Sequence, residues 1–110
     1  MRKRLVVLWL MALVLFPPLV WAVSVDLAWS YTVGNAVPSE FRLYRQLGCQ
    51  GDFRLQGHVT YPGERFTDVG VSWNGLYCYK VTAYDLASSE ESSPSNVVSV
   101  VCKRNKGLCY

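Results

Sequence analysis

The chain has 110 residues, of which 51% are hydrophobic and 17% are charged, and its formal net charge is +3. This length supports at most one domain, and such high hydrophobicity with so little charge excludes a disordered chain. The eight glycines and five prolines are too few for a collagen-like or low-complexity polymer.

The first 22 residues have the organisation of a secretory signal peptide. Three basic residues at positions 2–4 precede an uninterrupted apolar run at positions 5–16. Val20 and Ala22 then place a β-branched and a small residue at positions −3 and −1 of a cleavage site. We therefore predict that residues 1–22 are a signal peptide cleaved after Ala22, and that the remaining chain is secreted or periplasmic.

An uncleaved membrane anchor is the alternative interpretation of this segment. No charged residue interrupts positions 5–23, which is nearly the length that a spanning helix requires. Pro17 and Pro18 would break such a helix, however. Contact with a membrane is therefore expected only through an unprocessed signal segment.

Cleavage after Ala22 would leave 88 residues with eight basic and eight acidic side chains, and hence no net charge. The basic excess of the whole chain thus belongs to the predicted targeting segment. A neutral domain lacks the basic patch that nucleic-acid binding requires, so we expect no nucleic-acid partner.

Apolar and polar residues alternate along residues 23–110, and no stretch has the 3.6-residue period of an amphipathic helix. Turn residues divide this part into six expected strands, at 23–32, 41–46, 53–60, 65–69, 76–85 and 96–102. Six short strands in 88 residues predict an all-β sandwich, with a barrel less favoured. The expected core residues include Trp29, Tyr77, Tyr79 and Val81.

Four cysteines follow the predicted signal peptide: Cys49, Cys78, Cys102 and Cys109. An even number in a small exported domain predicts two disulfide bonds, with three possible connectivities. Zinc is a weaker interpretation, because the chain has no Cys-x-x-Cys pair and only one histidine, His58.

Residues 67–68, 75–85 and 91–98 resemble the E, F and G strands of a fibronectin type III domain of the bacterial type. Upstream, Leu27-x-Trp29 resembles its B strand and Phe41-x-Leu43 its C strand, so that the resemblance covers about residues 25–101. It implies an immunoglobulin-like sandwich over residues 23–102, followed by a C-terminal tail at 103–110. It also implies that Tyr77 forms a tyrosine corner, a buried ring whose hydroxyl bonds to backbone in the preceding crossover.

The chain departs from the family at the first strand, A, because only six residues separate Ala22 from Trp29. Strand A is therefore expected to be missing or vestigial, which would leave an unpaired sheet edge. This edge could stay solvated or could accept a strand from another chain.

The resemblance also implies a disulfide pairing, because the family topology brings three of the cysteines to one end of the sandwich. We expect Cys49 to pair with Cys78 and Cys102 with Cys109. The other pairing considered, Cys78 with Cys102 and Cys49 with Cys109, is slightly disfavoured by strand register.

The sequence predicts no enzyme, cofactor or metal site. His58 has no nucleophile at a suggestive spacing. Asp68 is better explained by backbone capping than by acid catalysis, and Glu90 and Glu91 are expected to keep a serine-rich loop solvated.

Binding remains as the expected activity. The outward face of strands 41–46 and 76–85 carries Tyr44, Lys80, Thr82 and Tyr84, and Trp73 lies in a turn. Such side chains suit a protein or carbohydrate partner at a cell surface, although Tyr44 and Tyr84 could instead pair across strands and only stiffen the sheet. We therefore expect a non-catalytic binding or adhesion module of unknown oligomeric state. The alternative is a structural subunit of an envelope or appendage assembly, completed by strand addition at its open edge.

Overall fold

A computed structural model describes residues 8–13, 23–32, 34 and 37–110. Ala22, the predicted cleavage position, lies outside the described residues. The described part contains nine strands and one short 3-10 helix, η1 (Arg104–Lys106). None of its helices is long and apolar enough to cross a bilayer.

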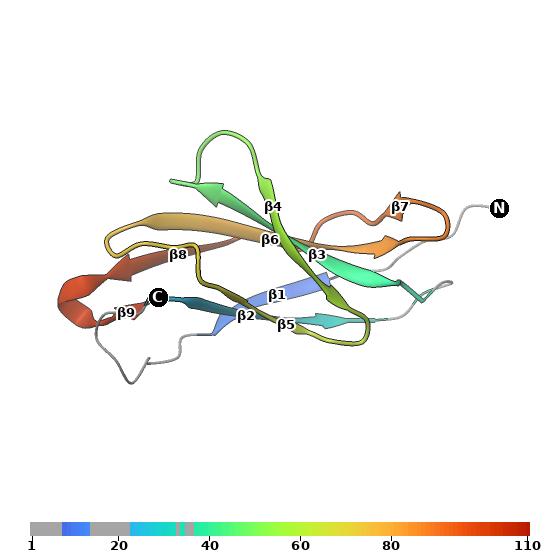
Figure 1. The fold of residues 1–110 in the computed structure, drawn as a ribbon, viewed down its shortest axis with the longest axis horizontal. Coiled ribbons are helices and arrows are strands. Elements are labelled where there is room, and N and C mark those ends of the chain that lie inside the picture. The colour runs from blue at the N-terminus through green and yellow to red at the C-terminus, as the bar shows by residue number, and fades with distance from the viewer. Residues whose placement is uncertain (1–7, 14–22, 33, 35–36) are drawn as a thin grey trace.

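The strands form two antiparallel sheets that lie face to face (Figure 1). The smaller sheet has the order β1 (Leu8–Leu13), β2 (Val25–Tyr31), β5 (Arg65–Asp68). The larger sheet has the order β4 (Arg54–Thr60), β3 (Glu40–Leu47), β6 (Leu76–Asp85), β8 (Val98–Lys103), β9 (Leu108–Cys109), and β7 (Glu90–Glu91) also pairs with β6. The all-β sandwich predicted from the sequence is confirmed.

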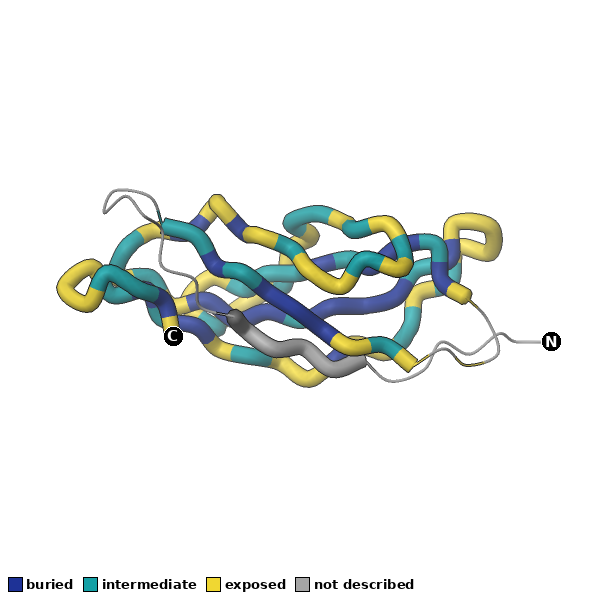
Figure 2. The backbone as a smooth tube through the Cα atoms, turned by 90° about the horizontal axis from the view of Figure 1, so that it is seen from below, coloured by how far each residue is buried: buried dark blue, intermediate teal, exposed yellow. Residues whose placement is uncertain are grey.

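The core lies between the two sheets, where alternate side chains of each strand point inward. On β6, Tyr77, Tyr79, Val81 and Ala83 are all at most 4% exposed, which is the inward face predicted from the alternation. Trp29 of β2 faces them from the other sheet and is 3% exposed. Figure 2 shows that buried positions follow the strands, whereas exposed positions gather in the connecting loops.

The six expected strands correspond to β2 to β6 and β8, and their bounds differ by no more than two residues from those expected. The described residues form three further strands. Two of them, β7 and β9, are two residues long and lie in segments expected to be a loop and a tail.

The third additional strand, β1, comes from the predicted signal peptide, so that the expectation of a missing strand A concerns only the chain that remains after cleavage. No strand precedes β2 in the described residues from Val23 onward. Leu8–Leu13, from within the predicted signal peptide, instead pairs antiparallel with β2, so that Leu8 lies opposite Tyr31 and Leu13 opposite Asp26.

The serine-rich segment after β6 is ordered by hydrogen bonds to the edge of that strand. The Ser92 and Ser95 hydroxyls accept hydrogen bonds from the backbone N–H groups of Ala83 and Val81, each at 2.9 Å. The backbone N–H groups of the same serines donate to the Ala83 and Val81 carbonyls, each at 2.8 Å. These bonds satisfy the part of the β6 edge that β8 does not reach, since β8 pairs only with Leu76 to Tyr79.

Residues 103–110, expected as a tail, fold back onto β8. The backbone groups of Val101 and Tyr110 exchange two hydrogen bonds of 2.9 and 2.8 Å, and Cys102 lies opposite Cys109. The C-terminal segment is therefore part of the larger sheet.

Tyr77 forms the expected tyrosine corner. Its ring is 4% exposed, and its hydroxyl accepts a hydrogen bond of 2.7 Å from the backbone N–H of Ser72 in the preceding crossover. A Cβ atom at Gly75 would lie only 2.5 Å from this hydroxyl oxygen. The turn before β6 thus requires a glycine at position 75 for the ring to dock.

Candidate functional site

The outer face of β3 and β6 carries an open hollow of about 340 Å³. Tyr44, Lys80 and Thr82, three of the residues predicted to form a binding surface, line it together with Phe53, Glu91, Ser92 and Pro94. Tyr44 and Lys80 lie directly opposite each other on neighbouring strands. The structure therefore brings together most of the side chains that the alternation placed on this face.

The Lys80 ammonium lies close to two aromatic rings in this hollow. Its Nζ lies 4.4 Å from the centroid of the Phe53 ring and 5.6 Å from that of Tyr44. Both distances are within the range of cation–π attraction. These two contacts favour one position of the ammonium group at the surface.

Glu91 has a more specific role than keeping its loop solvated. Its Oε2 accepts hydrogen bonds from the hydroxyls of Tyr44 and, at 2.6 Å, Thr82. Burial of the Tyr44 phenol, together with its hydrogen bond to Glu91, raises the pKa of Tyr44 above its ordinary value. Glu91 therefore connects Tyr44 of β3 and Thr82 of β6 at one side of the hollow. No local sequence pattern predicts the contact with Tyr44, because 47 residues separate the two.

Tyr84, the fourth residue predicted on this face, does not line the hollow. The Arg42 guanidinium lies over its ring, 3.4 Å from the centroid, and Arg42 also forms an ion pair of 2.9 Å with Glu40. Tyr84 lies opposite Glu40 and Tyr44 opposite Lys80, so the direct cross-strand pairing of the two tyrosines that we considered does not occur.

Trp73 lies apart from this surface. It is partly buried and packs against the core, and its indole N–H is buried without a hydrogen-bond partner in the described part of the chain. His58 is exposed on β4, as expected for a surface imidazole.

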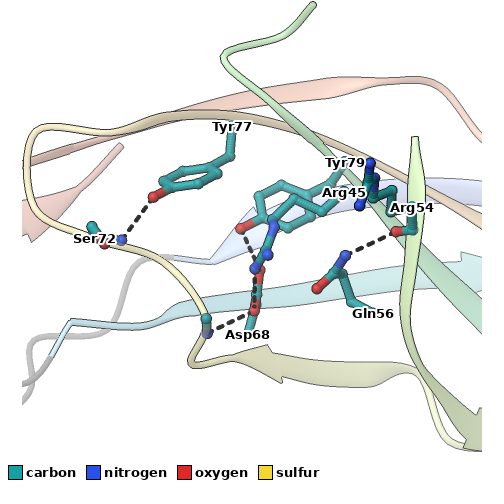
Figure 3. A network of polar contacts seen from close by, with 8 residues as sticks. Arg45, Arg54, Gln56, Asp68, Ser72, Tyr77 and Tyr79 are labelled. Carbon is teal, nitrogen blue, oxygen red and sulfur yellow. Dashed lines mark hydrogen bonds and ion pairs between the residues drawn. The ribbon is translucent and has the colours of Figure 1, made fainter. Parts of the chain in front are cut away.

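A buried polar network joins the two sheets near the end of β5 (Figure 3). Arg45 Nη1 donates to both carboxylate oxygens of Asp68, at 3.0 and 2.9 Å. The Tyr79 hydroxyl donates to Oδ2 at 2.8 Å, and the backbone N–H of Gly70 donates to Oδ1 at 2.9 Å. The bond from the Gly70 N–H is the backbone cap expected for Asp68, and it is one of the four hydrogen bonds that this carboxylate accepts.

Arg45 was not among the residues predicted from the sequence, although the alternation along β3 indicates that its side chain points inward. Phe41, Leu43 and Arg45 occupy alternate positions of β3, so that a charged side chain continues an inward-facing apolar series. A charge on that face requires a buried partner. Asp68 meets this requirement from the other sheet.

Burial and the hydrogen bond to Asp68 raise the pKa of the Tyr79 phenol far above its ordinary value of 10.0. The folded protein therefore retains this proton at a pH where the unfolded chain, with a tyrosine pKa of about 10, releases it. Stability from this group is complete below pH 10 and is lost as the pH rises further. We expect the free energy of unfolding to fall by up to about 1.4 kcal/mol per pH unit above pH 10 because of Tyr79.

Urea unfolding of the wild type and of Tyr79→Phe between pH 8.5 and 11 tests this expectation. The variant loses one hydrogen bond and is less stable at pH 8.5, but the difference from the wild type should shrink above pH 10. A constant difference over the whole range would contradict the proposed protonation.

The structure joins Cys49 to Cys78 and Cys102 to Cys109, which is the pairing that the resemblance implied. The first bond connects the turn between β3 and β4 to β6, and the second connects β8 to β9. Disulfide bonds of this kind form and persist in oxidising environments. No three metal-ligating side chains cluster in the described residues.

No family model matches the chain, and no curated protein matches its sequence significantly. Its structure is similar to the sixth fibronectin type III domain of human fibronectin type III domain containing protein 3, with a TM-score of 0.62 and 22% identity over 84% of this chain and 80% of that one. An Fn3-like protein from Clostridium thermocellum matches with a TM-score of 0.55 and 18% identity, over 69% and 73% of the two chains.

A third similar structure is pectate lyase PelI from Erwinia chrysanthemi in complex with tetragalacturonic acid. The TM-score is 0.64 and the identity 17%, and the match covers 86% of this chain but only 28% of the lyase. At these identities the likeness concerns the fold. The protein has the fibronectin type III fold, an immunoglobulin-like β-sandwich.

Proposed function

We propose that this protein is an exported, non-catalytic binding module that engages a glycan through the hollow between Phe53 and Glu91. The observation that carries the proposal is that the Lys80 ammonium lies within cation–π distance of two aromatic rings, in a hollow that hydrogen-bonding groups also line. The protein is secreted or periplasmic in this proposal, in keeping with the predicted signal peptide and the two disulfide bonds.

The lining of the hollow suits a sugar in two ways. Aromatic side chains offer apolar surface with little entropy cost, and the Tyr44 and Phe53 rings flank the hollow. The Lys80 ammonium and the Glu91 carboxylate provide a donor and an acceptor for hydroxyl groups, and Lys80 could also pair with an acidic sugar. The hollow thus combines two aromatic rings with a few convergent polar groups, and such groups can fix the orientation of a small ligand.

The choice of a glycan over a protein partner rests partly on the structural neighbours. The similar lyase is in complex with tetragalacturonic acid, and a β-1,2-glucanase from Parabacteroides distasonis also matches, with a TM-score of 0.66 and 23% identity over 91% of this chain and 13% of that one. The fold thus accompanies proteins that act on polysaccharides.

Calorimetric titration of the exported protein with tetragalacturonic acid and with a neutral tetrasaccharide tests this proposal. We expect measurable binding of at least one, weakened at least about tenfold by Lys80→Ala and by Phe53→Ala. His58→Ala, on the exposed face of β4, is the matched control and should leave binding unchanged. If neither these sugars nor a broader glycan array binds, a glycan partner is excluded and a protein partner becomes the better interpretation.

One observation favours the second candidate function, a structural subunit that associates through a strand edge. In the full-length chain, the edge of β2 is covered by a segment that export would remove.

A further inference from the structure

The outer edge of β2 is covered in the full-length chain by β1, a strand that belongs to the predicted signal peptide. The two strands pair over six residues, from Leu8 opposite Tyr31 to Leu13 opposite Asp26 (Figure 1). Cleavage after Ala22 would remove β1. The described residues from Val23 onward contain no strand that could replace it.

The backbone groups that this cleavage would expose can be identified from the pairing on the other side of β2. The N–H of Trp29 donates to the Glu64 carbonyl at 3.1 Å, toward β5, and the N–H of Tyr31 also donates to Glu64. Because backbone groups of successive residues in a strand point to opposite sides, the alternate residues Asp26, Ala28 and Ser30 direct theirs toward β1. These three residues would present free donors and acceptors in the processed protein.

This edge lacks the features that usually prevent strands from associating. Natural edge strands carry prolines, lysines, bulges or inward-pointing charges, or are very short. In contrast, β2 is seven residues long, contains no proline or lysine, and pairs in regular register with both neighbours. Its inward residues Val25, Leu27 and Trp29 are apolar and at most 3% exposed in the full-length chain.

We propose that in the processed protein the outer edge of β2 pairs antiparallel with the same edge of a second copy, about a two-fold axis at Ala28. This inference rests on the export and cleavage included in the proposed function. The axis places Ala28 of one copy opposite Ala28 of the other, and Asp26 of each copy opposite Ser30 of the other. The backbone groups of these residues then form the hydrogen-bonded pairs between the two strands. An interface of this kind is isologous and closes at two subunits.

The sequence of β2 is complementary to itself in this register. Leu27 of one copy lies opposite Trp29 of the other, and Val25 lies opposite Tyr31, so that the apolar inner layer continues across the axis. On the outer face, Asp26 lies opposite the exposed, uncharged Ser30. No like charges meet, and the neutral 88-residue domain has no net repulsion against its copy.

A charge introduced at position 30 tests this register, because it would lie opposite Asp26 twice in the dimer. The full-length chain is expressed in an export-competent host, and the purified protein is analysed by mass spectrometry for its N-terminus and by sedimentation equilibrium for its mass. We expect a chain that begins at Val23 and forms a dimer.

Ser30→Glu should raise the dimer dissociation constant at least about tenfold, whereas the matched variant Ser30→Lys should leave it unchanged or lower it. Asp26→Lys combined with Ser30→Glu should restore the dimer. Thermal unfolding of each variant checks that the fold is retained, which is expected because the Ser30 side chain is exposed.

A processed protein that stays monomeric, or a dimer that responds equally to both charges at position 30, would overturn the inference and leave the glycan proposal intact. A purified chain that retains Leu8–Leu13 would overturn it together with the predicted processing. A processed protein that forms the dimer but binds no glycan would count against the proposed function alone.

Discussion

Reduction of both disulfide bonds is expected to lower the free energy of unfolding by roughly 6 kcal/mol. The chain-entropy relation gives about 3.6 kcal/mol for Cys49–Cys78, which are 29 residues apart, and about 2.4 kcal/mol for Cys102–Cys109, which are 7 apart. Small domains are stable by about 5–15 kcal/mol in total, and a domain of this size buries a comparatively small fraction of its surface. The reduced protein should therefore be close to unfolded at 37 °C.

Urea unfolding with and without reductant measures this effect. Cys49→Ala combined with Cys78→Ala isolates the first bond and should cost about 3.6 kcal/mol. The other pair is less suitable as a measure of loop entropy, because Cys102 and Cys109 are 0% and 4% exposed and their replacement would also leave a cavity. An unchanged urea midpoint after complete reduction would contradict a stabilising role.

Replacement of Asp68 by alanine is expected to destabilise the protein by about 3 kcal/mol or more. The substitution leaves the Tyr79 hydroxyl, the Gly70 N–H and the Arg45 guanidinium without their acceptor. Removal of one partner from a buried ion pair typically costs about 3–5 kcal/mol. The lower end applies here, because the Arg45 side chain remains 20% exposed and water can partly solvate it.

Two comparisons make the Asp68 measurement specific. Arg45→Met combined with Asp68→Ala should cost less than the sum of the single substitutions, since it leaves no unpaired charge. Arg42→Met, which breaks the more exposed ion pair with Glu40, should cost about 1 kcal/mol or less. An Asp68→Ala effect as small as that of Arg42→Met would show that the buried network does not stabilise the fold.

The two proposed interactions occupy different parts of the sandwich. The hollow lies on the outer face of the larger sheet, and the β2 edge belongs to the smaller sheet. A dimer formed through β2 would therefore present two hollows at once. Two linked sites bind a polymeric glycan more tightly than either site alone when both can engage.

The amino-acid sequence by itself determined the fold class and most of the strands. The alternation along β6 predicted both its bounds and its inward face, because successive side chains of a strand point to opposite sides and only one side is buried. The same rule placed Tyr44, Lys80 and Thr82 on one outer face, where they line a single hollow. The cysteine pairing followed once the resemblance to a known sandwich supplied the order of its strands.

Only the tertiary structure decided which distant residues meet and which segment completes the smaller sheet. Asp68 contacts Arg45 and Tyr79 from 23 and 11 positions away, and no local pattern specifies such pairs because their partners are set by sheet packing. The uniformly apolar segment at positions 5–16 has no period from which a strand could be predicted, so that its pairing as β1 depends on the free edge that β2 offers. Local alternation thus determined which face of each strand is buried. Tertiary packing determined the buried Arg45–Asp68 ion pair, the contacts of Glu91 in the hollow, and the pairing of β1 with the β2 edge that export would expose.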